Sequence, residues 1–196
     1  MNAPDAAEQD AHDMARLSAG HDAAFNALMD RHAERLFHYL LRQLNNETDA
    51  ADIAQETFVR IYHHRARFQP GQNFSTWLYT IATNLVRDRF RWRKRHPQVS
   101  LDADDQETAA FKEVLPDSAL SPSDQTDTNE RAVEVRKAVA SLPDDLRTAV
   151  ILSEYDGLPH AQIAAILKCS AKAVESRLYR ARAHLRKRLE SLLQPG

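Results

Sequence analysis

The chain has 196 residues, of which 43% are hydrophobic and 28% are charged, an ordinary composition that excludes low-complexity and collagen-like proteins. This length allows one large domain or two small ones. The formal net charge is only −2, but it hides two strongly basic segments, 87–95 and 177–188, separated by an acidic stretch at 98–130. Two basic surfaces joined by an acidic tether favour a nucleic-acid partner.

A soluble helical protein of the cytoplasm is expected. Glycine is scarce, at four residues, and few runs alternate in the manner of strands. The single cysteine, Cys169, cannot form an internal disulfide, which favours a reducing compartment. The acidic segment 1–13 lacks the apolar core of a signal peptide, and no apolar run reaches the ~20 residues of a membrane span.

The first elements in chain order are a polar lead-in and two helices. Residues 1–20 are predicted to be a partly ordered lead-in. Helical spacing then predicts a helix over 23–44, with Phe25, Leu28, Leu36, Leu40 and Leu44 on one face. Thr48 is expected to cap the next helix, which should run to about Arg67.

A turn and a third helix follow. Pro70-Gly71 is a turn signal. Either Ser75 or Asn73 can cap the helix after it, which should continue through the basic segment until Pro97 ends it. Trp77 is assigned to the core, because it shares a helical face with Ile81 and Leu85.

A second unit is predicted after an acidic linker. Residues 98–129 read as a flexible linker, with a short helical turn near 111–115. One helix is expected over 130–141, and a second from Pro143 to Asp156-Gly157. The predicted fold is therefore all-α: two small helical domains joined by a flexible linker, the C-terminal one ending in a helix-turn-helix.

Residues 158–188 have the pattern of that helix-turn-helix. Its first helix should end at Leu167, with Lys168 in the left-handed turn position and Ser170 capping the second helix. Pro159 stands where a Ser or Thr cap would be expected. Ile163, Leu167 and Val174 would form the wedge between the helices, and Ala164 would permit their close approach.

The second helix should lie in a DNA major groove. The residues expected to face the groove are Lys172, Ser176, Arg177, Tyr179 and Arg180. Arginines contact guanine edges or phosphates, and serine can contact either. Glu175, an acid on the same helix, would accept a hydrogen bond from cytosine or repel a phosphate.

Nothing in the sequence predicts a catalytic, metal or cofactor site. His63 and His64 are adjacent and would point about 100° apart on a helix, a poor chelate. Zinc-protease and di-iron spacings are missing, as is a Gly-rich phosphate loop. Cys169 is interpreted as a small apolar filler in the helix turn.

Four motifs together resemble the extracytoplasmic-function group of bacterial sigma factors, most closely the envelope-stress type. They are DAADIAQETFVRIYHH at 49–64, FSTWLYTIATNLVRDRFR at 74–91, LPDDLRTAVILSEYDGLPHAQIAAIL at 142–167 and VESRLYRARAHLRKRL at 174–189. The resemblance implies a subunit of RNA polymerase that recognises promoters, not an enzyme. It divides the chain into a lead-in (1–20), region 2 (21–97), a linker (98–129) and region 4 (130–196).

The resemblance implies that the helix at 49–64 docks the coiled coil of the polymerase β′ clamp. Asp49, Asp52 and Glu56 are spaced i, i+3, i+7 and form an acidic stripe opposite an apolar face. Such a stripe would suit a basic partner. Gln55 and Arg60 flank the stripe and would add polar contacts; an ordinary solvated face is the alternative.

The resemblance also implies a reader of the −10 promoter element at 68–95. Phe68 would stack on an unpaired base, and Asn84 would bind its edge. Phe68 could instead be a loop residue tucked into the core, and Trp92 could stack on a base or cover a helix. The full set assigned to −10 DNA is Phe68, Asn73, Asn84, Arg87, Arg91 and Arg93, the arginines tracking phosphates.

The partners implied are core RNA polymerase (β′ clamp and β flap), promoter DNA read at its −35 element by the helix-turn-helix, and an anti-sigma factor. No membrane insertion is expected. Two other functions stay open from the residues alone. A dimeric helix-turn-helix repressor would bind duplex DNA without polymerase. An all-α nuclease would use the carboxylates around Asp52 with Mg²⁺.

Overall fold

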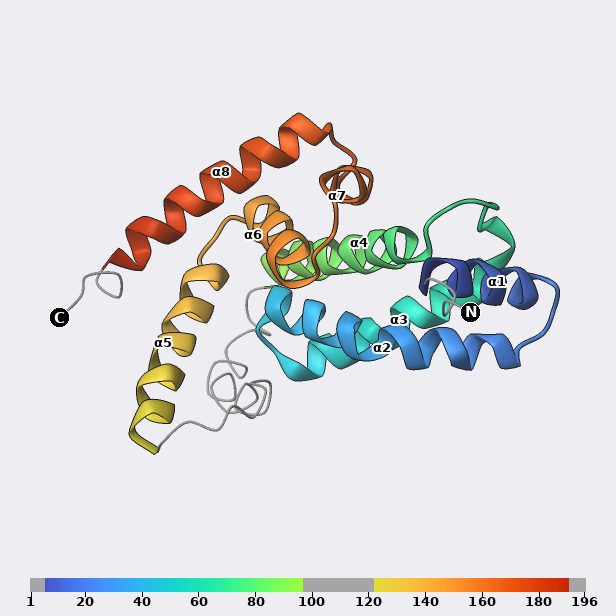
Figure 1. Cartoon of the computed structure of the whole chain (residues 1–196), viewed down its shortest axis with the longest axis horizontal. Helices are drawn as coiled ribbons and strands as arrows, with labels where there is room; N and C mark the ends of the chain where they lie inside the picture. Colours follow the sequence, from blue (N-terminus) through green and yellow to red (C-terminus); the bar gives the residue numbers. More distant parts are fainter. Residues whose placement is uncertain (1–5, 97–121, 191–196) are drawn as a thin grey trace, which may run out of the picture.

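The computed structural model describes residues 6–96 and 122–190, with side chains described outside 122–130. All its regular elements are helical within these ranges, as the sequence predicts. The N-terminal unit contains four α-helices: α1 (Ala6–Ser18), α2 (Ala23–Leu44), α3 (Glu47–His63) and α4 (Phe74–Arg95), with a 3₁₀ turn, η1 (Arg65–Arg67), before the loop that leads into α4. Helices α2 and α3 pack side by side, and α4 lies against them (Figure 1).

The first helix is the clearest correction to the sequence prediction. Residues 6–18 form α1, which packs against α2 and contributes Met14 and Leu17, both fully buried, to the core. The prediction of a partly ordered lead-in at 1–20 is therefore wrong for this part. Only two large apolar side chains anchor α1, which is too weak a periodic signal to stand out from a polar segment.

The second helix has the predicted bounds, and the third begins earlier than predicted. Asn46, not Thr48, is the N-cap of α3, because its side chain accepts a hydrogen bond from the Asp49 amide at 2.8 Å. The preceding residue, Asn45, ends α2 in the left-handed conformation. The two asparagines thus make the tight turn that sets α3 against α2.

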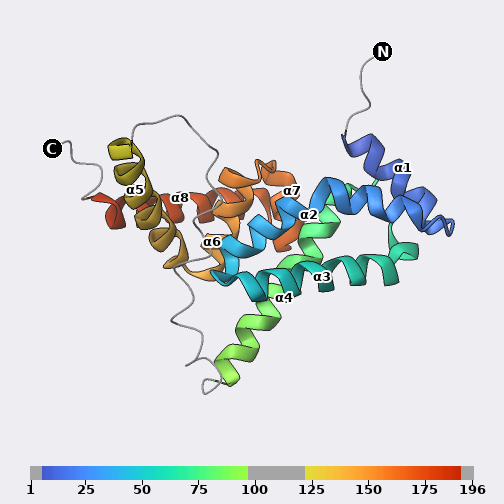
Figure 2. The ribbon, with the colours of Figure 1, turned by 90° about the horizontal axis from the view of Figure 1, so that it is seen from below.

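Helix α4 is capped by Asn73, one of the two predicted candidates. The Asn73 side chain accepts hydrogen bonds from the Thr76 amide at 2.9 Å and the Thr76 hydroxyl at 3.2 Å. Its apolar face, including Leu78 and Ala82, is buried. Figure 2 shows the C-terminal part of α4 projecting beyond the other helices of the unit.

The C-terminal unit comprises α5 (Pro122–Ala140), α6 (Asp144–Val150), a π-helical turn η3 (Ile151–Tyr155), α7 (His160–Leu167) and α8 (Ala171–Arg188). Helix α5 begins at Pro122, so the prediction of a linker up to residue 129 is wrong for its last part. The turn predicted at 111–115 lies outside the described residues. The helix expected from Pro143 is present, with Pro143 as its N-cap, but it ends in the π-helical turn.

The helix-turn-helix is confirmed in its backbone details. Lys168 adopts the left-handed conformation (φ 54°, ψ 49°), and the Ser170 hydroxyl accepts a hydrogen bond from the Ala173 amide at 3.2 Å. Pro159 precedes α7 without a side-chain cap. The wedge residues Ile163, Leu167 and Val174 are all buried. Apolar wedge and capped turn together set the angle between α7 and α8.

The two units pack against each other and share one continuous apolar core. Helix α7 lies against α4, and η3 lies against α2 (Figure 1). Polar groups also cross the boundary. The Tyr79 hydroxyl donates to Asp156 at 2.8 Å, and Arg35 donates to the Asp156 carbonyl at 2.9 Å. Within the described ranges, none of the helices combines the length and hydrophobicity needed to cross a bilayer.

Candidate nucleic-acid interface

Helix α8 presents one exposed, polar and cationic face. Lys172, Ser176, Tyr179 and Arg180 are exposed, and their spacing of i, i+4, i+7 and i+8 places them on one side of the helix. The Tyr179 side chain is unusually open for an aromatic residue, at 77% exposure. Four of the five residues predicted to face a groove therefore lie together on the free side of the second helix.

Arg177, the fifth predicted residue, lies differently. It is half-buried, and its guanidinium donates to the Cys169 sulfur at 2.8 Å and to the Asp145 carboxylate at 3.3 Å. These contacts tie α8 to the turn before it and to α6. Arg177 therefore supports the helix-turn-helix from within, and Cys169 is its acceptor as well as a filler of the turn.

Glu175 shares the exposed side of α8. Its carboxylate lies 3.9 Å from the His160 ring at the start of α7. The acid thus lies on the same side as the residues predicted to face a groove, beside a group that carries a positive charge when protonated. A carboxylate among cations on such a surface selects against phosphate at that point and favours an exposed amino group of a base.

The C-terminal half of α4 forms a second cationic surface. An open groove of about 840 Å³ runs along it, with Ile53 and Leu85 contributing apolar atoms and Arg89, Trp92 and Arg95 on its walls. Trp92 is 38% exposed, stacks on His96 at 4.8 Å and lies under the Arg89 guanidinium. An exposed indole can stack on a base, while the arginines around it can bind phosphates.

Asp49 does not share the outward stripe predicted for it. Its side chain is buried and forms ion pairs with Arg89 and Arg93 of α4. The hydrogen bond that Arg89 donates to the Asp49 carboxylate is the main reason that the pKa of Arg89 lies above its usual range. The sequence pattern missed this because helical spacing shows which residues share a face, but not which neighbouring helix covers that face.

The rest of the predicted stripe on α3 is open to solvent. Asp52 and Gln55 are exposed, and Glu56 forms a half-exposed ion pair with Arg60 at 2.7 Å. Val59 lies on the same side, seven residues after Asp52, and is 40% exposed. Val59 was not among the residues predicted for this stripe, although an apolar residue within a polar stripe is a recognisable signal of a binding surface.

The loop at 68–73 carries an aromatic cluster. Phe68 is half-buried, and its ring centroid lies 5.3 Å from that of Trp77 and 6.3 Å from that of Phe74. The alternative reading of Phe68 as a residue packed against the core thus describes this conformation. Trp77 packs against the core, as predicted. Gly71 allows the turn, with φ at 81°.

The remaining predicted residues of this surface lie on α4 or at its start. Asn84 and Arg87 are half-buried, and Arg91 is exposed and paired with Asp88. These three are spaced i, i+3 and i+7, so they follow one side of the helix. Arg93 and Asn73 are already engaged, the first by Asp49 and the second as the helix cap. Among the described residues, no cluster of three His, Cys, Asp or Glu side chains could hold a metal ion.

Comparisons with known proteins match both units. A model described as Sigma-70 region 2 matches residues 28–96, and one described as Sigma-70, region 4 matches residues 132–185. The ECF RNA polymerase sigma factor SigW of Bacillus subtilis is 34% identical over 180 residues, covering 90% of this chain and 95% of the relative. The RNA polymerase sigma-H factor of Pseudomonas aeruginosa is 33% identical, covering 95% and 97%.

A solved structure has the same fold over most of the chain. The sigma factor RpoE of Bartonella quintana, in complex with the anti-sigma factor NepR, is 27% identical with a TM-score of 0.66. The match covers 85% of this chain and 96% of that one. The two matched segments lie within the two helical units, with α1 and the start of α2 preceding the first and the start of α5 preceding the second.

Proposed function

Because this chain belongs to the extracytoplasmic-function group of the sigma-70 family, we propose that it binds core RNA polymerase and directs it to promoters. It would recognise the −10 and −35 elements of each promoter and promote melting of the promoter DNA. The observation that carries the proposal is that each matched region forms a helical unit with its own exposed cationic helix face. The chemistry of RNA synthesis belongs to the polymerase, in the cytoplasm.

Helix α8 is the reader of the −35 duplex. Its open face offers Lys172 and Arg180 as donors to guanine edges or phosphates, with Ser176 and Tyr179 between them. Arg177 acts indirectly, by holding the turn through Cys169 and Asp145. A single helix makes a modest number of contacts with DNA. Promoter specificity therefore arises from −35 binding by α8 together with −10 binding by the N-terminal unit.

The loop at 68–73 and helix α4 are the reader of the −10 element. Melting exposes bases that a duplex hides, and capturing an unpaired base repays part of the cost of opening. Asn84 offers both a donor and an acceptor for a base edge. The ring of Phe68 lies at the edge of an aromatic cluster on which a base can stack. The cations of α4, Arg87 and Arg91, would follow the adjacent phosphates.

Helix α3 is the docking surface for the β′ clamp of the polymerase, and the C-terminal unit would contact the β flap. The open face of α3 combines the carboxylates of Asp52 and Glu56 with Gln55, Arg60 and the exposed Val59. Acidic groups around an apolar residue form the usual pattern of a protein interface with a basic partner.

Promoter reading requires the two units to separate. The names of the elements place them about 25 base pairs apart, on the order of 85 Å at 3.4 Å per base pair. In the described structure α7 packs directly on α4, and packed helices have axes only about 8–10 Å apart. The packed arrangement is therefore a resting form. An anti-sigma factor, the partner of the Bartonella quintana relative, would be a natural protein to stabilise it.

Run-off transcription with core polymerase on a library of randomised promoters tests the function. The chain should select templates with two conserved elements and a fixed spacing. A gel-shift on the selected duplex should show specific binding only when core polymerase is present. Tight and specific binding by the chain alone would instead favour a repressor, and the absence of start-site selection would refute the proposal.

A further inference from the structure

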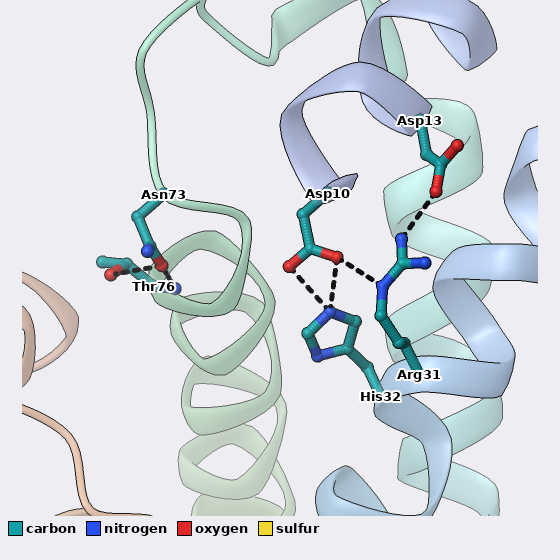
Figure 3. A network of polar contacts seen from close by, with 6 residues as sticks. All are labelled: Asp10, Asp13, Arg31, His32, Asn73 and Thr76. Carbon is teal, nitrogen blue, oxygen red and sulfur yellow. Dashed lines mark hydrogen bonds and ion pairs between the residues drawn. The ribbon is translucent and has the colours of Figure 1, made fainter. Parts of the chain in front are cut away.

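A buried network of charges joins α1 to the rest of the N-terminal unit. Asp10 and Asp13 of α1 are 3% and 8% exposed. Arg31 of α2 donates through Nε to Asp10 at 2.9 Å and through Nη2 to Asp13 at 2.6 Å. His32 Nε2 lies 2.9 and 2.8 Å from the two carboxylate oxygens of Asp10 (Figure 3).

This network is more than an attachment for α1. Met14 and Leu17 already anchor the helix through apolar burial. Buried carboxylates add a desolvation cost that is offset only when their partners are well placed. For Asp10, burial raises the pKa, but the hydrogen bonds and charges of His32 and Arg31 outweigh it and lower the pKa overall. The Asp10 carboxylate is therefore ionised and holds the ring of His32 in one orientation.

The oriented His32 ring reaches the end of the loop at 68–73. Its centroid lies 4.9 Å from that of Phe74, the first residue of α4. Phe74 in turn packs at 6.3 Å from Phe68 and at 6.4 Å from Trp77. Phe68, the side chain on which base stacking depends, thus rests on the ring of Phe74, and Asp10 of α1 fixes that ring through His32.

The other end of the same loop is also held by α1. The Ser18 hydroxyl, at the C-terminal end of α1, donates to the Arg65 carbonyl at 3.0 Å. Arg65 begins η1, the turn that leads into the loop. Helix α1 contacts both η1 and α4. It therefore bridges the entry and the exit of a loop that otherwise has the freedom of Gly71 at its tip.

We propose that α1 is a positioning element for the −10 loop at 68–73, acting at its exit through the contacts of Asp10 with His32 and of His32 with Phe74, and at its entry through Ser18. The inference rests on the proposed function, which assigns base capture to this loop. It goes beyond it by giving a role in −10 recognition to a helix that lies outside the matched region 28–96.

The test uses the complete chain assembled with core polymerase and a labelled single-stranded oligonucleotide carrying the −10 sequence selected in the run-off experiment. Asp10→Asn should weaken oligonucleotide binding several-fold, while affinity for core polymerase stays the same. Glu8→Gln removes an exposed carboxylate from the same helix and is the matched control, with unchanged binding expected. Ser18→Ala tests the loop entry without disturbing a buried charge.

A double variant that combines Asp10→Asn with Phe68→Ala distinguishes positioning of the loop from general stabilisation of the fold. If Asp10 acts through Phe68, Asp10→Asn should have little further effect once Phe68→Ala is present. The positioning role would be overturned if Asp10→Asn weakened oligonucleotide binding equally in the wild-type and Phe68→Ala chains. It would also be overturned if Asp10→Asn weakened binding to core polymerase as much as binding to the oligonucleotide. Either result would leave the proposed function intact. No effect of Phe68→Ala itself would instead refute base capture by the loop, and the inference with it.

Discussion

The Tyr79 hydroxyl of α4 donates a 2.8 Å hydrogen bond to the Asp156 carboxylate at the end of η3, joining the two units across their boundary. Both residues are buried, at 3% and 7% exposure. Tyr39 packs edge-on against Tyr79 at 5.0 Å and bonds Thr83 at 2.7 Å, so the donor belongs to an ordered layer between α2 and α4. The Tyr79–Asp156 pair is therefore a buried polar contact that contributes to the resting form within an otherwise apolar interface.

Removal of the Tyr79 hydroxyl should open the molecule. In Tyr79→Phe the Asp156 carboxylate loses its donor, at a cost of roughly 1–3 kcal/mol to the packed form. Small-angle scattering should report a larger radius of gyration. Tyr155→Phe is the matched control, since Tyr155 is exposed and keeps its ring under Arg42. Unchanged dimensions for Tyr79→Phe would show that the hydrogen bond does not hold the units together.

Packing of the two units should be tighter in mild acid. Burial raises the pKa of Asp156 above 3.8, against the opposing effects of Tyr79, Arg35 and Arg42. The packed form therefore binds a proton more readily than the separated form. Its advantage is complete below the ordinary value of 3.8 and is lost as the pH rises from there through the raised pKa. Asp156→Asn should remove this response, as followed by scattering or thermal melting from pH 3.8 upward.

The charge pair at α1 should respond to pH in the opposite sense. Because the pKa of Asp10 is lowered, its contribution to stability is complete above the ordinary value of 3.8 and is lost as the pH falls below it. Asp156 and Asp10 thus act on opposite sides of pH 3.8, so a response above this pH that survives Asp156→Asn would contradict the assignment to Asp156.

Loss of the Asn84 amide should impair promoter opening more than polymerase binding. Asn84→Ala removes a donor and an acceptor for the captured base, worth roughly 1–3 kcal/mol, or about 5- to 150-fold in the opening rate. Transcription should fall on a linear duplex and recover on a template melted beforehand. Asn26→Ala, at an exposed position of α2, is the control. Equal transcription from the duplex by wild type and Asn84→Ala would refute the role.

Reversal of the open carboxylates on α3 should weaken binding to core polymerase. We expect roughly a tenfold loss for Asp52→Lys with Glu56→Lys, measured by competition for labelled polymerase. Glu134→Lys, which reverses an exposed carboxylate on α5, should have no effect. Asp49→Lys should instead lower stability, since it would place a third cation beside Arg89 and Arg93. Unchanged affinity of the double variant would refute the docking surface.

Two arginines of α8 should behave differently. Arg180→Ala should weaken binding of the −35 element by about 1–3 kcal/mol, and initiation should fall only on promoters in which this element is intact. Arg177→Ala should lower the melting temperature, because it removes the contacts with Cys169 and Asp145. Footprints that ignore Arg180→Ala would exclude it from the interface.

The helical fold, the two units and the helix-turn-helix could be predicted from the sequence, because apolar periodicity, caps and turns are local. Ser170 and Lys168 fulfil their predicted roles for this reason. The exposure of each polar residue, by contrast, depends on how the helices pack. This packing buried Asp49 under two arginines, turned Arg177 inward and made α1 part of the core. A helical period defines a face, but the helix that packs against that face comes from a distant part of the chain, and its charges decide whether a side chain is a contact or a support.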